Sequence, residues 1–333
     1  MEGAVGLTRE DLIGEFLAKA GWGTAERRVL AADASFRRYD RLTLDGRPAV
    51  LMDAPPPKED VRPFLKIARH LLGLGYSAPG ILAEDVETGF LLLEDLGDAT
   101  FTRLLKAGEA EAPLYEMAVD LLIDLHRQTA PVGVAPYDRE KLLTEVALLT
   151  DWYVPAVGIE LDHNARAAYL AAWSDVLPLA RGVPDALVLR DFHVDNLMRI
   201  EGRNGIQACG LLDFQDALIG PVTYDLISLL EDARRDIDPA VKAAGRARYL
   251  AAFPALDEAA FDASWACLAA QRHAKVIGIF TRLCRRDGKP TYLQHISRLW
   301  RLFDASVRHP GLAPVRSWLE AHIPADKRLV PTP

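Results

Sequence analysis

The sequence contains few cysteines, and their spacing gives them no structural task. Only three occur, Cys209, Cys267 and Cys284. Their number is odd and no C-x-x-C pair exists, so neither a disulfide framework nor a zinc site is predicted. No uncharged apolar run approaches the ~18 residues of a membrane helix, and the start MEGAVGLTREDLIGEF lacks the apolar core of a signal peptide. We therefore expect reduced thiols, no membrane partner and a cytoplasmic location.

Basic charge is also scarce. The chain has 39 Lys and Arg against 47 Asp and Glu, a net charge of −8, and no local basic patch. Such a surface repels a phosphate backbone, so nucleic acid is excluded as an expected partner. The apolar content of 50% and charged content of 26% are typical of globular proteins. The length of 333 residues predicts about two domains, and no feature indicates an obligate protein partner.

The first part of the chain has the texture of strands with one inserted helix. A helical stripe follows a predicted N-cap at Thr8. Short apolar runs over residues 27–53 are divided by Asp45-Gly46, a strong hairpin signal. A helix is predicted over 59–72 and a second hairpin over 81–94.

The later part of the chain is mostly helical. The clearest periodic segments are 114–128 and 161–179, and short strand-like runs interrupt the helices between 186 and 216. The predicted fold class is therefore α+β with two lobes. A small β-rich N-terminal lobe spans residues 1–95, and a larger helical lobe spans residues 98–333.

The densest polar cluster, RDFHVDN, lies on a loop between two of those short strands. Asp191 and Asn196 are five residues apart there, and Asp213 follows the next apolar run. In phosphoryl transfer, an Asp accepts the proton of the acceptor hydroxyl, while an Asn five residues later and a further Asp hold Mg²⁺ against nucleotide phosphates. A lone D-x-x-x-x-N also occurs in ordinary turns, but the second acidic loop and the β-rich lobe upstream favour the catalytic interpretation.

Longer motifs extend this pattern to most of the chain. LRDFHVDNLM and GLLDFQDALIGPVTYDL resemble the aminoglycoside phosphotransferase and choline kinase superfamily, whose fold is similar to that of protein kinases. ADASFRRYDRL, VLMDAPP, FLLLEDLGD and QRHAKVIGIFTRL resemble the anomeric N-acetylmuramate/N-acetylglucosamine kinases of bacterial cell-wall recycling. The resemblance implies a bilobal kinase-like fold, ATP as co-substrate, Mg²⁺ as cofactor and a small amino sugar as acceptor.

The same resemblance assigns roles by position. Asp191 matches the catalytic base, and Asn196 and Asp213 match the two metal ligands. Asp225 matches an acid that stabilises the catalytic loop from the start of a helix. Glu94 and Leu96 fall in the segment 94–97, which resembles the hinge whose backbone receives the adenine; an ordinary strand end is the alternative.

Two features depart from the kinase pattern. Met52 falls where a kinase offers a strand lysine to the phosphates, and the phosphate-covering turn Asp33-Ala34-Ser35-Phe36 has no glycine. Ser35, Phe36 and neighbouring backbone N–H groups are therefore expected to contact the nucleotide. Four side chains are candidates for the missing cation: Arg37, Arg38, Lys58 and Lys66.

Five further residues are candidates for the acceptor site: His193, Asp195, Trp152, Arg272 and Lys275. Each has a structural alternative. His193 either orients the loop or faces substrate, Asp195 either binds a sugar hydroxyl or is solvated, and Trp152 either stacks on a sugar ring or packs in the core. Arg272 and Lys275, with Arg282, either bind a lactyl carboxylate or form ion pairs.

The sequence therefore predicts a kinase that transfers the γ-phosphoryl group of ATP to the anomeric hydroxyl of N-acetylmuramate or N-acetylglucosamine, in peptidoglycan recycling. The alternatives are GTP as donor, another small hydroxyl acceptor such as an aminoglycoside, choline or a hydroxylated amino acid, and a nucleotide-binding pseudokinase. The absent strand lysine is the best argument for the last of these.

Overall fold

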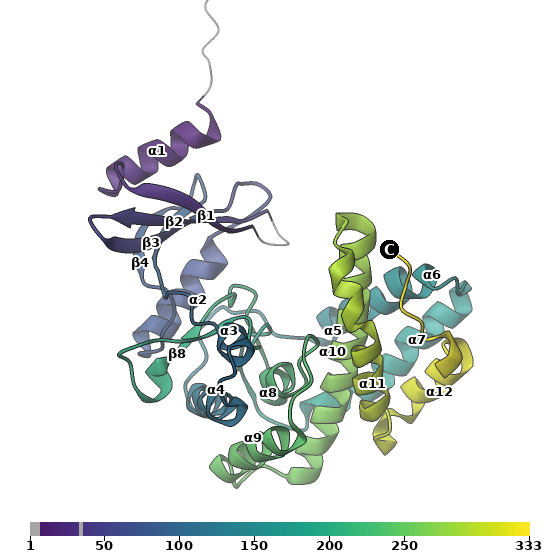
Figure 1. The fold of residues 1–333 in the computed structure, drawn as a ribbon. Coiled ribbons are helices and arrows are strands. Elements are labelled where there is room, and N and C mark those ends of the chain that lie inside the picture. The colour runs from purple at the N-terminus through teal and green to yellow at the C-terminus, as the bar shows by residue number, and fades with distance from the viewer. Residues whose placement is uncertain (1–6, 33–35) are drawn as a thin grey trace, which may run out of the picture. The chain divides into compact units, whose positions relative to one another are not determined.

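The strand-rich first part of the chain forms a five-stranded antiparallel sheet (Figure 1). The computed structural model describes residues 7–32 and 36–333. The strands follow the order β1-β2-β3-β5-β4 across the sheet. Their bounds are β1 Glu26–Ala32, β2 Arg38–Leu44, β3 Arg47–Asp53, β4 Ile81–Asp85 and β5 Phe90–Glu94. Both predicted hairpins are confirmed, and Asp45 and Gly46 carry the positive φ angles of 50° and 76° that such a turn requires.

One face of this sheet is covered by helix α1, Arg9–Lys19. The predicted N-cap Thr8 is confirmed, because its side chain accepts the Asp11 N–H and completes a capping box. Apolar side chains of α1 share one core cluster with inward residues of the sheet: Ile13, Phe16, Leu17, Leu42, Ala49, Leu51, Phe90 and Leu92. Successive strand residues point to opposite faces, so the residues between these, such as Val50 and Met52, line a cavity on the other face.

A later segment of the chain returns to this unit. Residues 1–108 and 195–216 form one compact unit, with α2 Arg62–Gly73, α3 Phe101–Lys106, β7 Leu197–Arg199 and β8 Cys209–Leu211. The returning segment is held by backbone bonds from Leu211 N to Ser77 O and from Arg199 N to Ala99 O, both 2.9 Å. Phe214 also stacks on Phe64 at 5.0 Å between centroids. The single boundary predicted near residues 95–98 therefore differs from the division seen in the structure.

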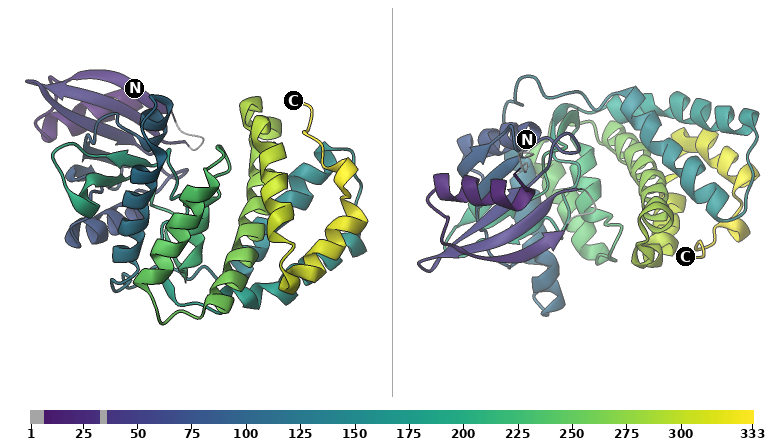
Figure 2. Two further views of the ribbon diagram at one scale, coloured as in Figure 1. Left: turned by 60° about the horizontal axis from the view of Figure 1, so that its bottom comes forward. Right: turned by 90° about the horizontal axis from the view of Figure 1, so that it is seen from above.

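The second unit, residues 109–194 and 217–333, is mostly helical. Its central element is α10, Glu258–Asp287, which packs against α5, α8 and α11 (Figures 1 and 2). The other helices are α4 Glu111–Leu125, α5 Arg139–Leu148, α6 Val154–Ala156, α7 His163–Val176, α8 Thr223–Leu230, α9 Pro239–Ala252, α11 Ile296–Ser306 and α12 Ala313–His322, and the strands β6 Asp185–Val188 and β9 Leu218–Pro221 pair antiparallel. The helices predicted over 114–128 and 161–179 are confirmed as α4 and α7.

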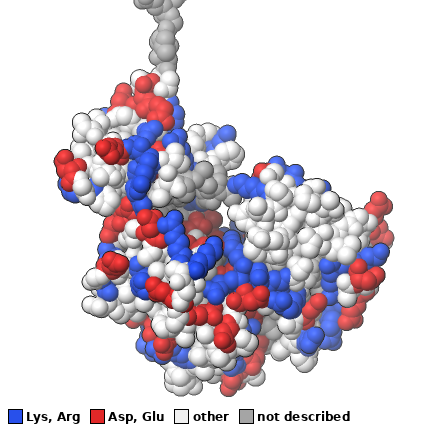
Figure 3. Space-filling model, viewed as in Figure 1, with Lys and Arg blue, Asp and Glu red and all other residues white. Residues whose placement is uncertain are grey.

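On the face that Figure 3 shows, acidic and basic side chains are interspersed over both units. Among the described helices, none combines the length and hydrophobicity that crossing a bilayer requires.

Helix α10 approaches α5 closely because it has no side chain at the point of contact. A Cβ atom built on Gly278 would lie 2.3 Å from the carbonyl carbon and 2.6 Å from the Cβ of Leu148. Both distances are far below van der Waals contact, so only glycine permits this approach.

Replacing Gly278 tests how closely α10 approaches α5. We expect Gly278→Ala to lower the free energy of unfolding by about 1–3 kcal/mol or more, because the added methyl group meets backbone atoms that cannot move alone. The control is Gly14→Ala in α1, where nothing lies within 4 Å of the new Cβ. That change gains about 0.8–1.0 kcal/mol of helix propensity and is expected to raise the melting temperature. Equal melting temperatures for the two variants, measured by circular dichroism, would contradict the tight contact.

Candidate functional site

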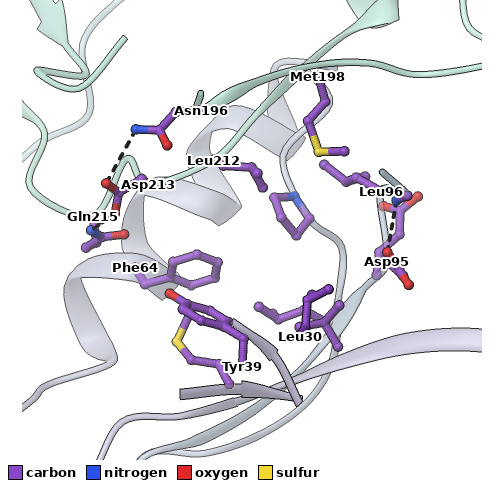
Figure 4. Close-up of a pocket in the computed structure, with 16 residues that line it drawn as sticks. Leu30, Tyr39, Phe64, Asp95, Leu96, Asn196, Met198, Leu212, Asp213 and Gln215 are labelled. Atoms are coloured by element: carbon purple, nitrogen blue, oxygen red, sulfur yellow. Dashed lines mark hydrogen bonds between the residues drawn. The ribbon is translucent and has the colours of Figure 1, made fainter. Parts of the chain in front are cut away.

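The first unit contains a cavity of about 370 Å³ on the face of the sheet opposite α1 (Figure 4). Apolar side chains form most of its wall: Leu30, Tyr39, Val50, Met52, Phe64, Pro79, Leu93, Leu96, Met198 and Leu212. Three polar residues gather along one edge: Asn196, Asp213 and Gln215. An apolar cavity with a few polar groups at one side suits a ligand that has a flat base at one end and a charged group at the other.

The segment predicted to be a hinge lines this cavity. Glu94, Asp95, Leu96 and Gly97 all contribute to the wall. The Glu94 carboxylate accepts the Gly80 N–H at 3.1 Å and pairs with Arg203 at 2.6 Å. These contacts tie the side chain of Glu94 into the unit, while its backbone runs along the cavity.

Asp95 is fixed in a similar way. Its carboxylate pairs with Nε of the buried Arg41 at 2.6 Å, and Arg41 also reaches Asp98 at 2.8 Å. Both carboxylates raise the pKa of Arg41, although burial acts against them. These ion pairs join strand β2 to residues 95–98, the segment that follows β5.

The two predicted metal ligands lie together at the polar edge. The Asn196 Nδ2 is 3.4 Å from Asp213 Oδ2, and Gln215 Nε2 donates to Asp213 Oδ1 at 2.6 Å (Figure 4). Asp213 has a φ of 57°, a conformation that non-glycine residues seldom adopt. Leu212 N donates to Asn196 O at 2.9 Å, which holds the two loops against one another.

The chemistry of these residues fits Mg²⁺. This ion takes oxygen ligands, and one or two protein side chains suffice where substrate phosphates supply the rest. Asp213 retains 37% exposure of its side chain toward solvent, so its carboxylate is accessible. Among the described residues no group of three or more His, Cys, Asp or Glu could hold a metal ion.

The structure shows which predicted cation lies near this edge. Met52 is buried at 1% exposure and faces the cavity, in the position expected for the absent lysine. Arg37 Nη2 lies 3.7 Å from Asp213 Oδ1, and its Nε lies 3.8 Å from Glu59 Oε2. Kinases use a strand lysine paired with a helix glutamate near the metal-binding Asp, and here Arg37 and Glu59 have the matching charges.

The other predicted nucleotide contacts are placed differently. Arg38 pairs with Asp40 at 3.0 Å and approaches Glu10 of α1 at 3.8 Å, on the face of the sheet away from the cavity. Phe36 is 62% exposed, donates its N–H to Glu59 at 3.0 Å, and lies under the Lys58 ammonium at 4.3 Å. The predicted contact Ser35 lies outside the described residues.

In the second unit, the loop that carries Asp191 is anchored by Asp225. Leu189 N and Arg190 N donate to the two Asp225 oxygens at 2.6 and 2.9 Å. Asp225 is fully buried, and burial raises its pKa to about 7 although both N–H bonds act to lower it. Arg190, one of the two donors, has a φ of 70°, a conformation that costs about 1–3 kcal/mol.

Asp191 itself lies among cations. Burial acts to raise the pKa of its carboxyl group, but the charges of Arg272, Lys275 and Arg190 outweigh burial and lower that pKa. A carboxylate kept ionised in this way is available to accept a proton.

The predicted acceptor residues Arg272 and Lys275 belong to a buried network in this unit. Arg272 Nη1 donates to Arg190 O at 3.2 Å and to Tyr224 OH at 3.3 Å. Lys275 pairs with the buried Glu145 at 3.0 Å, and Glu145 also pairs with Arg190. Lys275 therefore has an ion pair with Glu145, Arg272 has hydrogen bonds to a carbonyl and a phenol oxygen, and the charges of both also act on Asp191. Arg282, the third cation of that prediction, is partly buried on the same helix.

The remaining predicted acceptor residues lie on different elements. His193 is buried, and Arg234 Nη1 lies 3.3 Å from its Nε2. Asp195 belongs to the first unit, where its carboxylate accepts the hydroxyl of Thr102. Trp152 is partly exposed on a π-helical turn, Leu149–Tyr153, a distortion that often marks functional sites. None of these placements decides between the alternatives, which remain predictions.

Two residues of this arrangement, Glu145 and Tyr39, were not predicted from the sequence. Glu145 joins Arg190 and Lys275, yet it appears in the sequence as one acid on an ordinary amphipathic helix. Tyr39 follows Arg38 along β2, so its side chain points to the opposite face of the sheet and lines the cavity. This alternation of side chains along a strand is the sequence feature that could have predicted its position.

Chains of known activity resemble this one over nearly their whole length. An N-acetylmuramate/N-acetylglucosamine kinase from Pseudomonas aeruginosa is 42% identical, with 90% of both chains covered. A protein of the same name from Caulobacter vibrioides is 36% identical, covering 96% of this chain and 98% of its own.

Solved structures with much lower identity share the fold. A choline kinase from Cryptosporidium parvum has a TM-score of 0.59 at 12% identity, covering 93% of this chain and 99% of its own. An ADP-bound aminoglycoside phosphotransferase has a TM-score of 0.60 at 17% identity, covering 90% and 99%. The Phosphotransferase enzyme family matches residues 26–261. The predicted bilobal, kinase-like α+β fold is thereby confirmed, and the chain belongs to the phosphotransferase enzyme family.

Proposed function

We propose that this protein is an ATP-dependent kinase that phosphorylates the anomeric hydroxyl of N-acetylmuramate and N-acetylglucosamine, as a step of peptidoglycan recycling. The observation that carries this proposal is the 36–42% identity, over about nine-tenths of the chain or more, to proteins named as kinases of these two sugars. The family match supports phosphoryl transfer as the reaction class.

The cavity of the first unit suits the nucleotide. Its apolar wall receives the adenine, and the backbone of residues 94–97 is placed to hydrogen-bond the base edge. The polar edge with Asn196 and Asp213 faces the phosphates. Asn196 and Asp213 would hold Mg²⁺ at this edge, and the ion would supply positive charge to the phosphates. Arg37 supplies a further positive charge beside Asp213, in place of the strand lysine.

The second unit supplies the base. Asp191 accepts the proton of the anomeric hydroxyl while the sugar oxygen bonds to the γ-phosphorus and ADP departs. A hemiacetal hydroxyl is more acidic than a primary alcohol, so a carboxylate of low basicity can assist its deprotonation. The ion pairs that lower the pKa of Asp191 are therefore compatible with this acceptor.

The role of Asp191 is tested by Asp191→Asn, which keeps the shape and removes the proton acceptor. We expect turnover to fall ~100-fold or more, with the affinity for Mg·ATP unchanged in calorimetric titration. The control is Asp175→Asn, an exposed carboxylate on α7, which should behave as wild type. An Asp191→Asn enzyme that retained most of its kcat would remove Asp191 from the mechanism.

The relocated cation is tested by a matched pair of neighbours. Arg37→Gln should raise the KM for ATP and lower kcat, whereas Arg38→Gln should leave both near wild type, because Arg38 lies on the α1 face. Adding Met52→Lys to Arg37→Gln restores a cation at the usual kinase position and should recover part of the lost activity. If the two arginine variants were indistinguishable, Arg37 would not have this role.

The proposed acceptor is tested by product chemistry. Purified protein is incubated with Mg·ATP and a panel containing both N-acetylated sugars, an aminoglycoside, choline and the 1-O-methyl glycoside of N-acetylglucosamine. We expect turnover of the two free sugars and none of the methyl glycoside, which lacks the anomeric hydroxyl. In phosphorus NMR the product should couple to the anomeric proton. Coupling to the C6 protons, or turnover of choline or the aminoglycoside alone, would refute the proposed acceptor and leave a kinase of another hydroxyl. No ATP consumption with any acceptor would favour a pseudokinase.

A further inference from the structure

One arginine of the first unit, Arg203, joins two segments that are far apart in the sequence. It lies in the connection between β7 and β8. Its Nη2 donates to Glu94 Oε1 at 2.6 Å, and its Nη1 donates to the hydroxyl of the buried Ser77 at 2.8 Å. A guanidinium group is planar and carries its donors in a fixed fork, so a single side chain holds both partners in one geometry.

Glu94, the acidic partner of Arg203, is the first residue of the segment 94–97 that lines the cavity. Its Oε2 accepts the Gly80 N–H at 3.1 Å, and its own backbone N–H donates to Gly80 O at 2.7 Å. The side chain and the backbone of Glu94 are therefore fixed together. Arg203 is not among the described residues that line the cavity, so it acts on the cavity wall through Glu94.

The hairpin of β7 and β8 connects Arg203 to the polar edge of the cavity. Arg203 lies at the closed end of this hairpin. At its open end, Leu212 N donates to Asn196 O at 2.9 Å, and Asp213 follows directly. In Figure 4, Asn196 and Asp213 lie at one side of the cavity and Leu96 lies at the opposite side. The hairpin therefore links the segment proposed to receive the base with the residues that face the phosphates.

The pair of Arg203 and Glu94 is poorly explained by stability alone. The two side chains retain 34% and 35% of their exposure to solvent. Ion pairs this accessible add little to the free energy of unfolding, because water screens the charges and the long side chains lose freedom. The contact can nevertheless fix the position of a backbone segment, since Glu94 is bonded to Gly80 through both its side chain and its main chain.

We propose that Arg203 is a positioning residue for the nucleotide: through Glu94 it holds the backbone of residues 94–97 where the base binds, with the hairpin that leads to Asn196 and Asp213 as the fixed frame. This proposal rests on the proposed function, since it requires a nucleotide in this cavity. Base and phosphates are joined covalently, so both ends bind at once only where the two parts of the wall are held in register. A wall ordered before binding loses less freedom when the ligand arrives, and this raises the affinity.

The test measures the two ends of the nucleotide separately, by calorimetric titration with adenosine and with magnesium tripolyphosphate. Arg203→Met removes the donors and keeps an unbranched side chain. We expect the Kd of adenosine to rise about tenfold, while the Kd of tripolyphosphate and the melting temperature stay near wild type. Arg203→Lys, which keeps the charge but not the fork, should give an intermediate Kd for adenosine.

Two further variants show whether Arg203 acts through Glu94. Adding Arg203→Met to Glu94→Leu should weaken adenosine binding no further than Glu94→Leu does alone, because residues that act as one unit are not additive. The matched control is Arg69→Met, which removes another arginine–glutamate pair of the same unit, with Glu84 at 2.5 Å. Arg69 and Glu84 lie outside the cavity wall, so this variant should bind both ligands as the wild type does.

A folded Arg203→Met protein with wild-type affinity for adenosine would overturn the proposal. An equal loss of affinity for adenosine and tripolyphosphate would also overturn it, because that result indicates a general loss of structure. If Arg203→Met fails to fold, Glu94→Leu takes its place, and a wild-type Kd for adenosine there would refute the positioning role. Failure of the proposed function is recognised in the wild-type protein alone, which would then bind neither adenosine nor Mg·ATP, and the positioning role would fall with it.

Discussion

The loop that carries Asp191 depends on one buried carboxylate. Asp225 accepts two consecutive backbone N–H groups, and Arg190, one of the two donors, has a left-handed conformation. The turn directs the Arg190 side chain to Glu145 and its carbonyl oxygen to Arg272. The position of Asp191, the next residue, thus follows from a contact made far away in sequence at the start of α8. The unfavourable backbone conformation of Arg190 persists because the two hydrogen bonds to the buried Asp225 carboxylate offset its cost.

The interior of the second unit gathers charge around this turn. Glu145 pairs with Arg190 and Lys275, while Arg272 contacts the loop directly. Buried charges are tolerated when each is paired, and this network has the further effect of keeping Asp191 ionised. A weak base suffices in phosphoryl transfer, because positioning and charge neutralisation supply most of the catalysis. The network therefore holds the loop of Asp191 in place and lowers the basicity of the Asp191 carboxylate.

Local signals predicted the elements of the fold and the order of the site, but not its long-range contacts. The Asp45-Gly46 hairpin and the Thr8 cap depend on adjacent residues, so their residue types sufficed. Residues 195–216 belong to the first unit and are held there by backbone hydrogen bonds to Ser77 and Ala99. Every residue type has the same backbone carbonyl group, so the sequence does not indicate which carbonyls accept these bonds. The proximity of Arg37 to Asp213, on which its proposed role depends, could be known only from their side-chain distance.

Helix α10 fixes several of these relations at once, since one unbroken 30-residue helix carries Arg272, Lys275, Gly278 and Phe280. Each residue added to a helix turns the rest by about 100° and advances it by about 1.5 Å. A single insertion between Arg272 and Phe280 would therefore turn the Phe280 ring away from Arg234 while Arg272 kept its contact with Arg190. Both contacts therefore require this interval to keep its length. Changes in the length of the chain must be absorbed elsewhere, in the connections that precede and follow α10.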